Sequence, residues 1–314
     1  MRRAFVFPGQ GAQTIGMGLA LAETWPAARA VFDEVDAALG EPLSQLIWHG
    51  DAAELQLTRN AQPALMATSI AALRALEAEG IGMEHVDFVA GHSLGEITAL
   101  CAAGALGLAD AARLLRARGL AMQAAVPVGV GAMAVLLGLD FAQAQVVAAE
   151  AAEGEICQAA NDNDPGQVVV SGHAAAVARA VDIAKSHGAK RAMLLPVSAP
   201  FHCALMAPAA AVLAEALAEV VIMAPQVPIV VNVRAEAVID PALIRDLLVA
   251  QVTGVVRWRE SVLWLERAGV TDFWEIGAGK ALSGMIRRTA GAGVQTTAVG
   301  APEDVTRLKA LLSA

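Results

Sequence analysis

A serine between two glycines is the first set of residues that could do chemistry in this chain. Gly91-His92-Ser93-Leu94-Gly95 fits G-x-S-x-G and stands between two apolar runs. Small neighbours let a strand turn sharply into a helix, so that the serine projects and the helix N-terminus offers N–H groups to an oxyanion. We expect a nucleophile elbow here. A glycine-flanked turn without chemistry is the alternative.

A serine nucleophile needs a base to take its proton. The candidates are the six histidines His49, His85, His92, His173, His187 and His202. His202 lies after an apolar run, where we expect the carboxyl edge of a parallel sheet and hence an active site. A packing histidine is an equal alternative there, and His92 should point away from the serine. No acidic residue stands out as a triad partner, so a carbonyl group is expected to orient the base.

Arg118 stands in the middle of an apolar stripe. Its neighbours at three and four positions are Leu114, Leu115, Ala121 and Met122. A buried guanidinium needs an anion, and its planar fork fits a carboxylate. Two interpretations stay open: an arginine that binds an internal or bound carboxylate, and an arginine that reaches water at the end of the stripe.

The elements that must position these residues alternate between strands and helices. Strands are expected at 3–9, 86–91, 131–139, 190–199, 228–233 and 272–277. Helices are expected at 63–80, 96–107, 108–126, 141–152, 174–188, 204–220, 242–252, 256–269 and 280–290. This alternation predicts an α/β fold whose large domain has a parallel, hydrolase-like sheet. The β-α-β-β-α-β order between about 131 and 197 predicts an inserted ferredoxin-like domain. The large domain should comprise 1–127 and 198–314, and the small domain 128–197.

Composition excludes several classes of function. The 314 residues are 56% hydrophobic and 17% charged, which indicates a folded chain. A net charge of −9 argues against nucleic acid as a partner. Three widely spaced cysteines show neither a metal nor a disulfide pattern and fit the cytoplasm. The uncharged stretch 119–139 contains Pro127 and several glycines, so we interpret it as a helix end, a turn and a strand rather than a membrane span.

Two further motifs have plain interpretations. Asn161-Asp162-Asn163-Asp164 is expected to be a turn, with Asn161 or Asn163 facing a pocket as the less favoured alternative. The segment GAGK at 277–280 is expected to be a glycine turn, because it lacks the full phosphate-loop pattern.

Seven motifs together carry a family resemblance. They are FVFPGQGAQ, GHSLGE, RGxxMQxAVP, PGQVVVSG, HCALM, QxxxxVRW and EIGAGKALSGM, in this order from about residue 4 to residue 290. Together they resemble the malonyl-CoA:acyl carrier protein transacylases of bacterial fatty acid synthesis. They also resemble the acyltransferase domains of polyketide synthases.

The resemblance implies roles for the matching residues. Ser93 would carry the malonyl ester, and His202 would be the general base and then the general acid. Gln251 would orient His202 through its main-chain carbonyl, which accounts for the missing acid. Gln10 and Leu94 would donate backbone N–H groups to the oxyanion.

Substrate recognition is implied in the same way. Arg118 would bind the malonyl carboxylate, and the ring of Phe201 would crowd an α-methyl branch and so favour malonyl over methylmalonyl. The basic pairs Lys190–Arg191 and Arg287–Arg288 are our candidates for docking the acidic acyl carrier protein, with a solvated face as the alternative.

The resulting expectation is an [acyl-carrier-protein] S-malonyltransferase. It would move malonyl from malonyl-CoA to the phosphopantetheine thiol of acyl carrier protein, without a metal or other cofactor. We expect a cytoplasmic monomer with no membrane partner. The alternatives are a serine thioesterase or hydrolase, a malonyl transferase of a polyketide or malonate decarboxylase system, and a non-catalytic carrier-protein docking subunit.

Overall fold

The computed structural model describes residues 2–312 and contains two separate sheets. Sheet A has six strands in the order β10-β9-β1-β2-β7-β8. Their bounds are β1 (Arg2–Phe7), β2 (Phe88–Gly91), β7 (Ile229–Val231), β8 (Glu236–Val238), β9 (Val270–Ile276) and β10 (Gln295–Val299). Every pairing in it is parallel except that of β7 with β8. The predicted α/β class with a parallel sheet is confirmed.

The strand β1 shows why sheet A is covered on both faces. Phe5 and Phe7 pack into the large core under one face, whereas Ala4 and Val6 pack into a second core on the other. Successive side chains of a strand point to opposite faces, and a parallel sheet is stable when helices cover both. Helices α5 (Thr58–Ala78), α6 (Leu94–Ala102) and α7 (Leu108–Ala124) line the first face, and α12 (Trp258–Arg267) and α13 (Ala281–Thr289) line the second.

The periodicity predicts the nine helices α5 to α13 but none of the α-helices before Thr58 or after Val299. The bounds of the helices are α1 (Leu19–Thr24), α2 (Pro26–Leu39), α3 (Leu43–His49), α4 (Ala52–Gln56), α5 (Thr58–Ala78), η1 (Met83–His85), α6 (Leu94–Ala102), α7 (Leu108–Ala124), α8 (Phe141–Ala152), α9 (Ala174–Ala184), η2 (Ala204–Met206), α10 (Ala207–Ala218), α11 (Pro241–Thr253), α12 (Trp258–Arg267), α13 (Ala281–Thr289) and α14 (Pro302–Leu312). Within the described residues, no helix combines the length and the apolar character that a membrane crossing requires.

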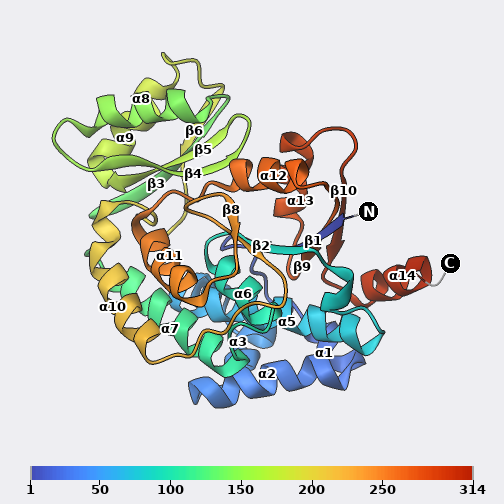
Figure 1. Cartoon of the computed structure of the whole chain (residues 1–314). Helices are drawn as coiled ribbons and strands as arrows, with labels where there is room; N and C mark the ends of the chain where they lie inside the picture. The colour runs from blue at the N-terminus through green and yellow to red at the C-terminus, as the bar shows by residue number, and fades with distance from the viewer. Residues whose placement is uncertain (1, 313–314) are drawn as a thin grey trace.

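Sheet B is antiparallel and has the strand order β4-β5-β3-β6. Its bounds are β3 (Gly131–Leu137), β4 (Cys157–Asp164), β5 (Gln167–His173) and β6 (Arg191–Leu194). Helices α8 and α9 pack on it over a small alanine- and valine-rich core. Figure 1 shows this unit at the opposite end of the molecule from α2. The predicted β-α-β-β-α-β order of this unit is confirmed.

Two elements differ from the sequence prediction in a way that matters for the site. Helix α5 begins at Thr58 and carries Pro63 inside it, although Pro63 was expected at its first turn. The strand β4 runs through Asp164, so the Asn161–Asp164 segment is strand rather than turn. The turn follows at Pro165-Gly166, where Gly166 has a φ of 94°.

Candidate active site

Ser93 occupies a sharp junction between β2 and α6. Its φ of 53° and ψ of −108° are strained for a residue with a side chain. A Cβ on Gly91 would lie 1.9 Å from the backbone of Gly95, and a Cβ on Gly95 would lie 2.3 Å from Phe7 O. Both glycines are therefore required by the close approach of strand and helix. The geometry is that of a nucleophile elbow.

His202 faces the serine. Its Nε2 lies 2.8 Å from Ser93 Oγ, and its Nδ1 lies 2.9 Å from the main-chain oxygen of Gln251. A carbonyl oxygen accepts hydrogen bonds but cannot donate them, so Nδ1 carries the proton and Nε2 is left to accept one from Ser93. Burial, with the charge of Arg118 as a second cause, lowers the pKa of His202 to about 3. The imidazole is therefore neutral at pH 7 and can act as a base.

The backbone around His202 differs from the expectation in one respect. We expected this histidine at the edge of a parallel sheet, but the preceding strand, β6, is an edge strand of antiparallel sheet B. The chain returns from β6 through residues 195–201, and His202 has a φ of 60°. Periodicity alone identifies the strand but not the sheet that it joins.

Arg118 is 2% exposed, which excludes the interpretation that it reaches water. Its guanidinium donates to Gln62 Oε1 at 2.7 Å, to Gln251 Oε1 at 2.9 Å and to Ser93 Oγ at 3.0 Å. These three acceptors are neutral oxygens. Burial lowers the pKa of Arg118 to about 10, so the group stays charged at pH 7. A cation held beside the serine by neutral partners is suited to an anionic substrate group.

A cavity of about 470 Å³ opens beside these groups. Ser93, His202, Arg118 and Phe201 all line it. Gln10 and Leu94, the two expected donors to an oxyanion, line it too. As the first residue of α6, Leu94 needs no intrahelical acceptor for its N–H. The structure thus brings seven of the expected residues together, since Gln251 contacts both His202 and Arg118.

The Asn161–Asp164 segment reaches this cavity. Asn161 and Asn163 line it, whereas Asp162 accepts from Arg259 on α12 and Asp164 from Arg288 on α13. The predicted turn is therefore wrong. The less favoured alternative, an asparagine that faces the pocket, is correct for both Asn161 and Asn163. Consecutive polar residues are typical of a turn, so the local sequence predicts one. The arginines that pair with Asp162 and Asp164 in the strand lie 97 and 124 positions away, where no local pattern reveals them.

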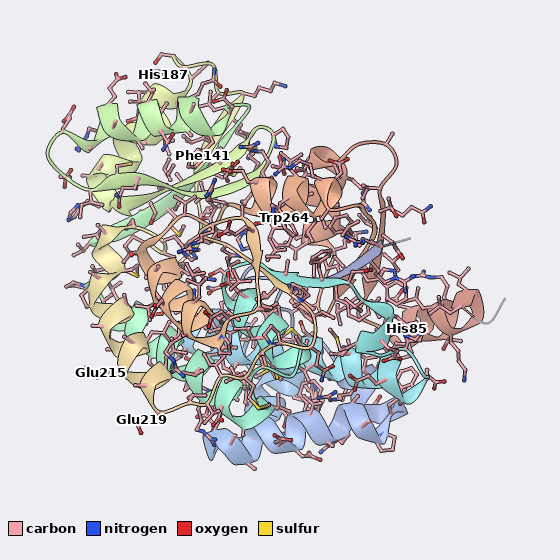
Figure 2. The ribbon with its side chains drawn as sticks, in the orientation of Figure 1. His85, Phe141, His187, Glu215, Glu219 and Trp264 are labelled. Carbon is pink, nitrogen blue, oxygen red and sulfur yellow. The ribbon has the colours of Figure 1, made fainter. Side chains whose placement is uncertain are left out.

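His92, expected to point away from the serine, is also part of the cavity wall. Its Nε2 lies 2.9 Å from Asn163 Oδ1. Its ring centroid lies 5.9 Å from that of Trp258. Figure 2 shows His187 at the outer end of the sheet B unit and His85 on another side of the molecule. Two of the six histidines, His92 and His202, line the cavity.

The basic pairs lie outside the cavity. Lys190 and Arg191 are exposed at the start of β6, and Arg287 and Arg288 are exposed at the end of α13. Arg288 is already paired with Asp164, at 2.7 Å. Docking of a carrier protein on these pairs stays a prediction.

In residues 2–312, no group of three or more His, Cys, Asp or Glu side chains could hold a metal ion. The three cysteines are buried and free. The GAGK segment is a tight turn between β9 and α13, in which Gly277 and Gly279 have φ values of 126° and 79°.

Comparison with known proteins agrees with this fold and identifies the family of the chain. The sequence model of the acyl transferase domain family matches residues 4–303. The chain is 50% identical over 303 residues to the malonyl CoA-acyl carrier protein transacylase of Bacillus subtilis, covering 96% of this chain and 94% of that protein. It is 47% identical to the protein of the same name from Escherichia coli K12, over 91% of this chain and 92% of that protein.

Solved structures of malonyltransferases have the same fold as this chain. An acyl-carrier-protein S-malonyltransferase from Bartonella henselae has a TM-score of 0.97, 53% identity and full coverage of both chains. A malonyl-transacylase in complex with a type II polyketide acyl carrier protein has a TM-score of 0.95 and 41% identity over the full length of both chains. The chain belongs to the acyl transferase domain family and, within it, to the malonyl CoA-acyl carrier protein transacylases.

Sequence reasoning missed three buried residues at the site. Gln62 on α5, Asn232 after β7 and Glu96 on α6 hold Arg118, the Ser93 N–H and Gln251, respectively. Glu96 directly follows GHSLG, and an acidic residue at the start of a mostly apolar helix, so close to the nucleophile, is the one signal that the sequence offered.

Proposed function

We propose that this enzyme transfers a malonyl group from malonyl-CoA to the phosphopantetheine thiol of acyl carrier protein through an ester on Ser93. The observation that carries the proposal is the convergence on one hydroxyl: His202 Nε2 lies 2.8 Å and Arg118 Nη2 lies 3.0 Å from Ser93 Oγ. A base and a cation at one oxygen suit an acyl group that carries its own carboxylate close to the reacting carbonyl.

The first half-reaction forms the ester. Ser93 Oγ attacks the thioester carbonyl carbon of malonyl-CoA while His202 Nε2 takes the hydroxyl proton. The backbone N–H groups of Leu94 and Gln10 stabilise the negative oxygen, and each such donor contributes about 3 kcal/mol. The carbon–sulfur bond then breaks, and the proton passes from His202 to the CoA sulfur.

The second half-reaction reverses the roles. The phosphopantetheine thiol of the carrier protein attacks the ester carbonyl and gives its proton to His202. The carbon–oxygen bond to Ser93 breaks, and His202 returns the proton to the serine oxygen. The main-chain oxygen of Gln251 holds the imidazole in the required tautomer throughout, in place of a carboxylate.

Arg118 supplies selectivity for a diacid. Its guanidinium would exchange the hydrogen bond to Ser93 Oγ for the malonyl carboxylate once the acyl group enters. Because its present acceptors are neutral, a substrate carboxylate would compensate a charge that is buried. A thioesterase acting on simple fatty acyl groups has no use for such a group.

Intact mass spectrometry tests the proposal directly. Wild-type protein mixed briefly with malonyl-CoA should gain one malonyl group, which holo acyl carrier protein then removes. Ser93→Ala should gain none. If the ester is instead lost to water at the same rate with or without carrier protein, the protein is a hydrolase.

The carrier protein itself is a second question. The names of the bacterial relatives and the carrier-protein complex among the structural neighbours support an acyl carrier protein as acceptor. We propose the carrier of fatty acid synthesis, and the type II polyketide partner named for that neighbour makes a polyketide carrier the second candidate. Discharge rates of the malonyl-enzyme by the two carriers, measured side by side, decide between them.

We further infer that the chain divides into a large domain of 1–127 and 198–314 and a small domain of 128–197. The alanine- and valine-rich core of sheet B falls entirely inside 128–197, as do β3 to β6, α8 and α9, which supports this division. We also propose that the enzyme acts in the cytoplasm as a monomer and needs no cofactor beyond its two substrates. Sedimentation of the purified protein tests the oligomeric state.

A further inference from the structure

Glu96 is a buried carboxylate beneath the nucleophile that the proposed reaction does not use. It is 0% exposed and lies in the first turn of α6. Its Oε2 accepts from the backbone N–H of Asn232 at 2.8 Å and from Gln251 Nε2 at 3.0 Å. Its Oε1 is buried without a hydrogen-bond partner among the described residues. Burying an acid with half its acceptors unfilled is costly, so its retention needs a reason.

The carboxamide of Gln251 lies between this acid and Arg118. Its Nε2 donates to Glu96 Oε2, and its Oε1 accepts from Arg118 Nη2 at 2.9 Å. A guanidinium only donates, so the amide must turn its oxygen to Arg118 and its nitrogen to an acceptor. Glu96 Oε2 supplies one such acceptor at 3.0 Å, beside Ser93 O at 3.1 Å and Asn232 Oδ1 at 3.2 Å. The carboxylate is the nearest of these three acceptors and the one that can carry a charge, so it contributes most to fixing which end of the amide faces the cation.

Glu96 also supports the elbow through Asn232. The Asn232 side chain accepts from Ser93 N at 2.8 Å and donates to Gly91 O at 2.7 Å. Its own backbone N–H is held by Glu96. One carboxylate oxygen therefore holds both the residue that positions Arg118 and the residue that positions the serine backbone.

We propose that Glu96 is a positioning residue for recognition of the substrate carboxylate, because its Oε2 orients the Gln251 carboxamide that holds the Arg118 guanidinium. This inference rests on the proposed function. An acyl group without a carboxylate does not use Arg118. Loss of the Glu96 oxygen should therefore slow acylation by malonyl-CoA more than acylation by acetyl-CoA.

The protonation state of Glu96 leaves this role intact. Burial raises the pKa of Glu96 to about 7, against the opposing effects of the Asn232 and Gln251 hydrogen bonds and the Arg118 charge. Because Oε2 already has two donors, a proton would sit on the unpartnered Oε1. The neutral acid would still offer Oε2 to the amide. A glutamine at this position should therefore replace Glu96, whereas an aspartate should be too short.

The test uses Glu96→Gln, which keeps the reach without the charge, and Glu96→Asp, which keeps the charge without the reach. The rate of Ser93 acylation is measured by intact mass with malonyl-CoA and with acetyl-CoA. We expect Glu96→Gln to keep the malonyl-to-acetyl ratio within about threefold of wild type. We expect Glu96→Asp to lower it about tenfold or more, as for a lost hydrogen bond to a charged group. Ile97→Val, a core substitution on the same helix, is the matched control.

Three results would overturn the inference: an unchanged ratio in Glu96→Asp, an equal loss for both acyl groups, or a loss in Glu96→Gln as large as in Glu96→Asp. Should Glu96→Asp fail to fold in a thermal unfolding assay, Gln251→Leu removes the amide itself and must lower the ratio similarly. Where Glu96→Asp folds, the double variant Glu96→Asp with Gln251→Leu must lower the malonyl-to-acetyl ratio no further than either single variant does. A wild-type protein that forms no malonyl ester contradicts the proposed function, whereas normal wild type with unaffected variants contradicts this inference alone.

Discussion

The two sheets of this enzyme contribute to one cavity in different ways. The reacting groups lie at irregular junctions, Ser93 between β2 and α6 of the sheet A unit and His202 on the segment that returns from β6: they are two of the four non-glycine residues with positive φ in residues 2–312. Sheet B contributes Met133 from β3, Val169 from β5 and Asn161 from β4, where the strand register shifts. The reacting groups thus depend on backbone with positive φ, whereas this part of the wall depends on strand residues without it.

The difference lies in what holds each part in place. The junctions are held by a buried network of amides and a carboxylate around Gln251 and Asn232. The wall is held from outside, where Asp162 and Asp164 of β4 pair with arginines of α12 and α13. Damage to the network should therefore change the reaction itself, and damage to the ion pairs should change stability and substrate affinity.

The largest effect should come from Arg118, in the network. Arg118→Met removes the cation, and we expect kcat/KM for malonyl-CoA to fall by about 10²- to 10³-fold, as when one partner of a buried charge contact is lost. Acylation by acetyl-CoA should change far less. Steady-state and single-turnover rates measure both. Arg113→Met, an exposed residue on the same helix, is the control. Equal losses for the two substrates would remove Arg118 from substrate recognition.

The pH dependence of the network should also be distinctive. His202 must be neutral to accept the serine proton, and burial with the Arg118 charge lowers its pKa to about 3. Acylation by malonyl-CoA should therefore stay constant between pH 8 and 5, whereas an ordinary histidine of pKa about 6.5 would lose about thirtyfold by pH 5. Unfolding restores the ordinary pKa of His202, so the contribution of this histidine to the stability of the folded state should fall as pH drops from about 6.5 towards 3. The raised pKa of Glu96 acts in the opposite direction between about pH 7 and its ordinary value, so the net loss of stability should appear below that range. A rate profile with its midpoint near 6.5 would contradict the lowered pKa of His202.

How much of this site the sequence predicts depends on how local each signal is. The elbow at Ser93 needs only five consecutive residues, and the buried Arg118 needs one helical stripe. Asp162 and Asp164 were misjudged because their arginine partners are remote in sequence. Glu96 contacts residues 136 and 155 positions away, which no periodic pattern reveals. The elbow and the buried arginine were therefore predictable from local sequence, whereas the polar contacts between distant segments, and with them the strand conformation of 161–164, were not.

Phe201 tests the boundary between the two regions, because it directly precedes His202 and lines the cavity. Its ring should exclude an α-methyl branch, and Phe201→Ser should relax malonyl over methylmalonyl selection. The loss should be about 1–3 kcal/mol of discrimination, the usual range for one methyl group in an apolar pocket. Competition between malonyl-CoA and methylmalonyl-CoA measures it. The same discrimination in both proteins would show that another residue selects the acyl group.

The wall should respond differently to Asp162→Asn. The Asp162 side chain is 1% exposed and pairs with Arg259, which reaches solvent. The substitution keeps an oxygen acceptor but removes the charge, so we expect about 1–2 kcal/mol less unfolding free energy. KM for malonyl-CoA should rise while the rate of ester formation at saturation stays near wild type. Chemical denaturation and kinetics measure these changes, with exposed Asp33→Asn as the control. If the substitution instead lowered only the rate of ester formation, the ion pairs of β4 would act on the reaction itself, as the buried network around Gln251 does.

The smallest effect should come from the basic pairs, one of which belongs to each region. Lys190→Glu with Arg191→Glu changes the sheet B side, and Arg287→Glu changes the α13 side without breaking the Arg288–Asp164 pair. Exposed charge pairs contribute about 0.2–1 kcal/mol each, so KM for the acidic carrier protein should rise up to about fivefold per pair. KM for malonyl-CoA should not change, and Arg29→Glu on α2, at the other end of the molecule in Figure 1, should alter neither. A rise from one side alone would place the carrier protein over that region, and no rise from either would show that both pairs are solvated surface.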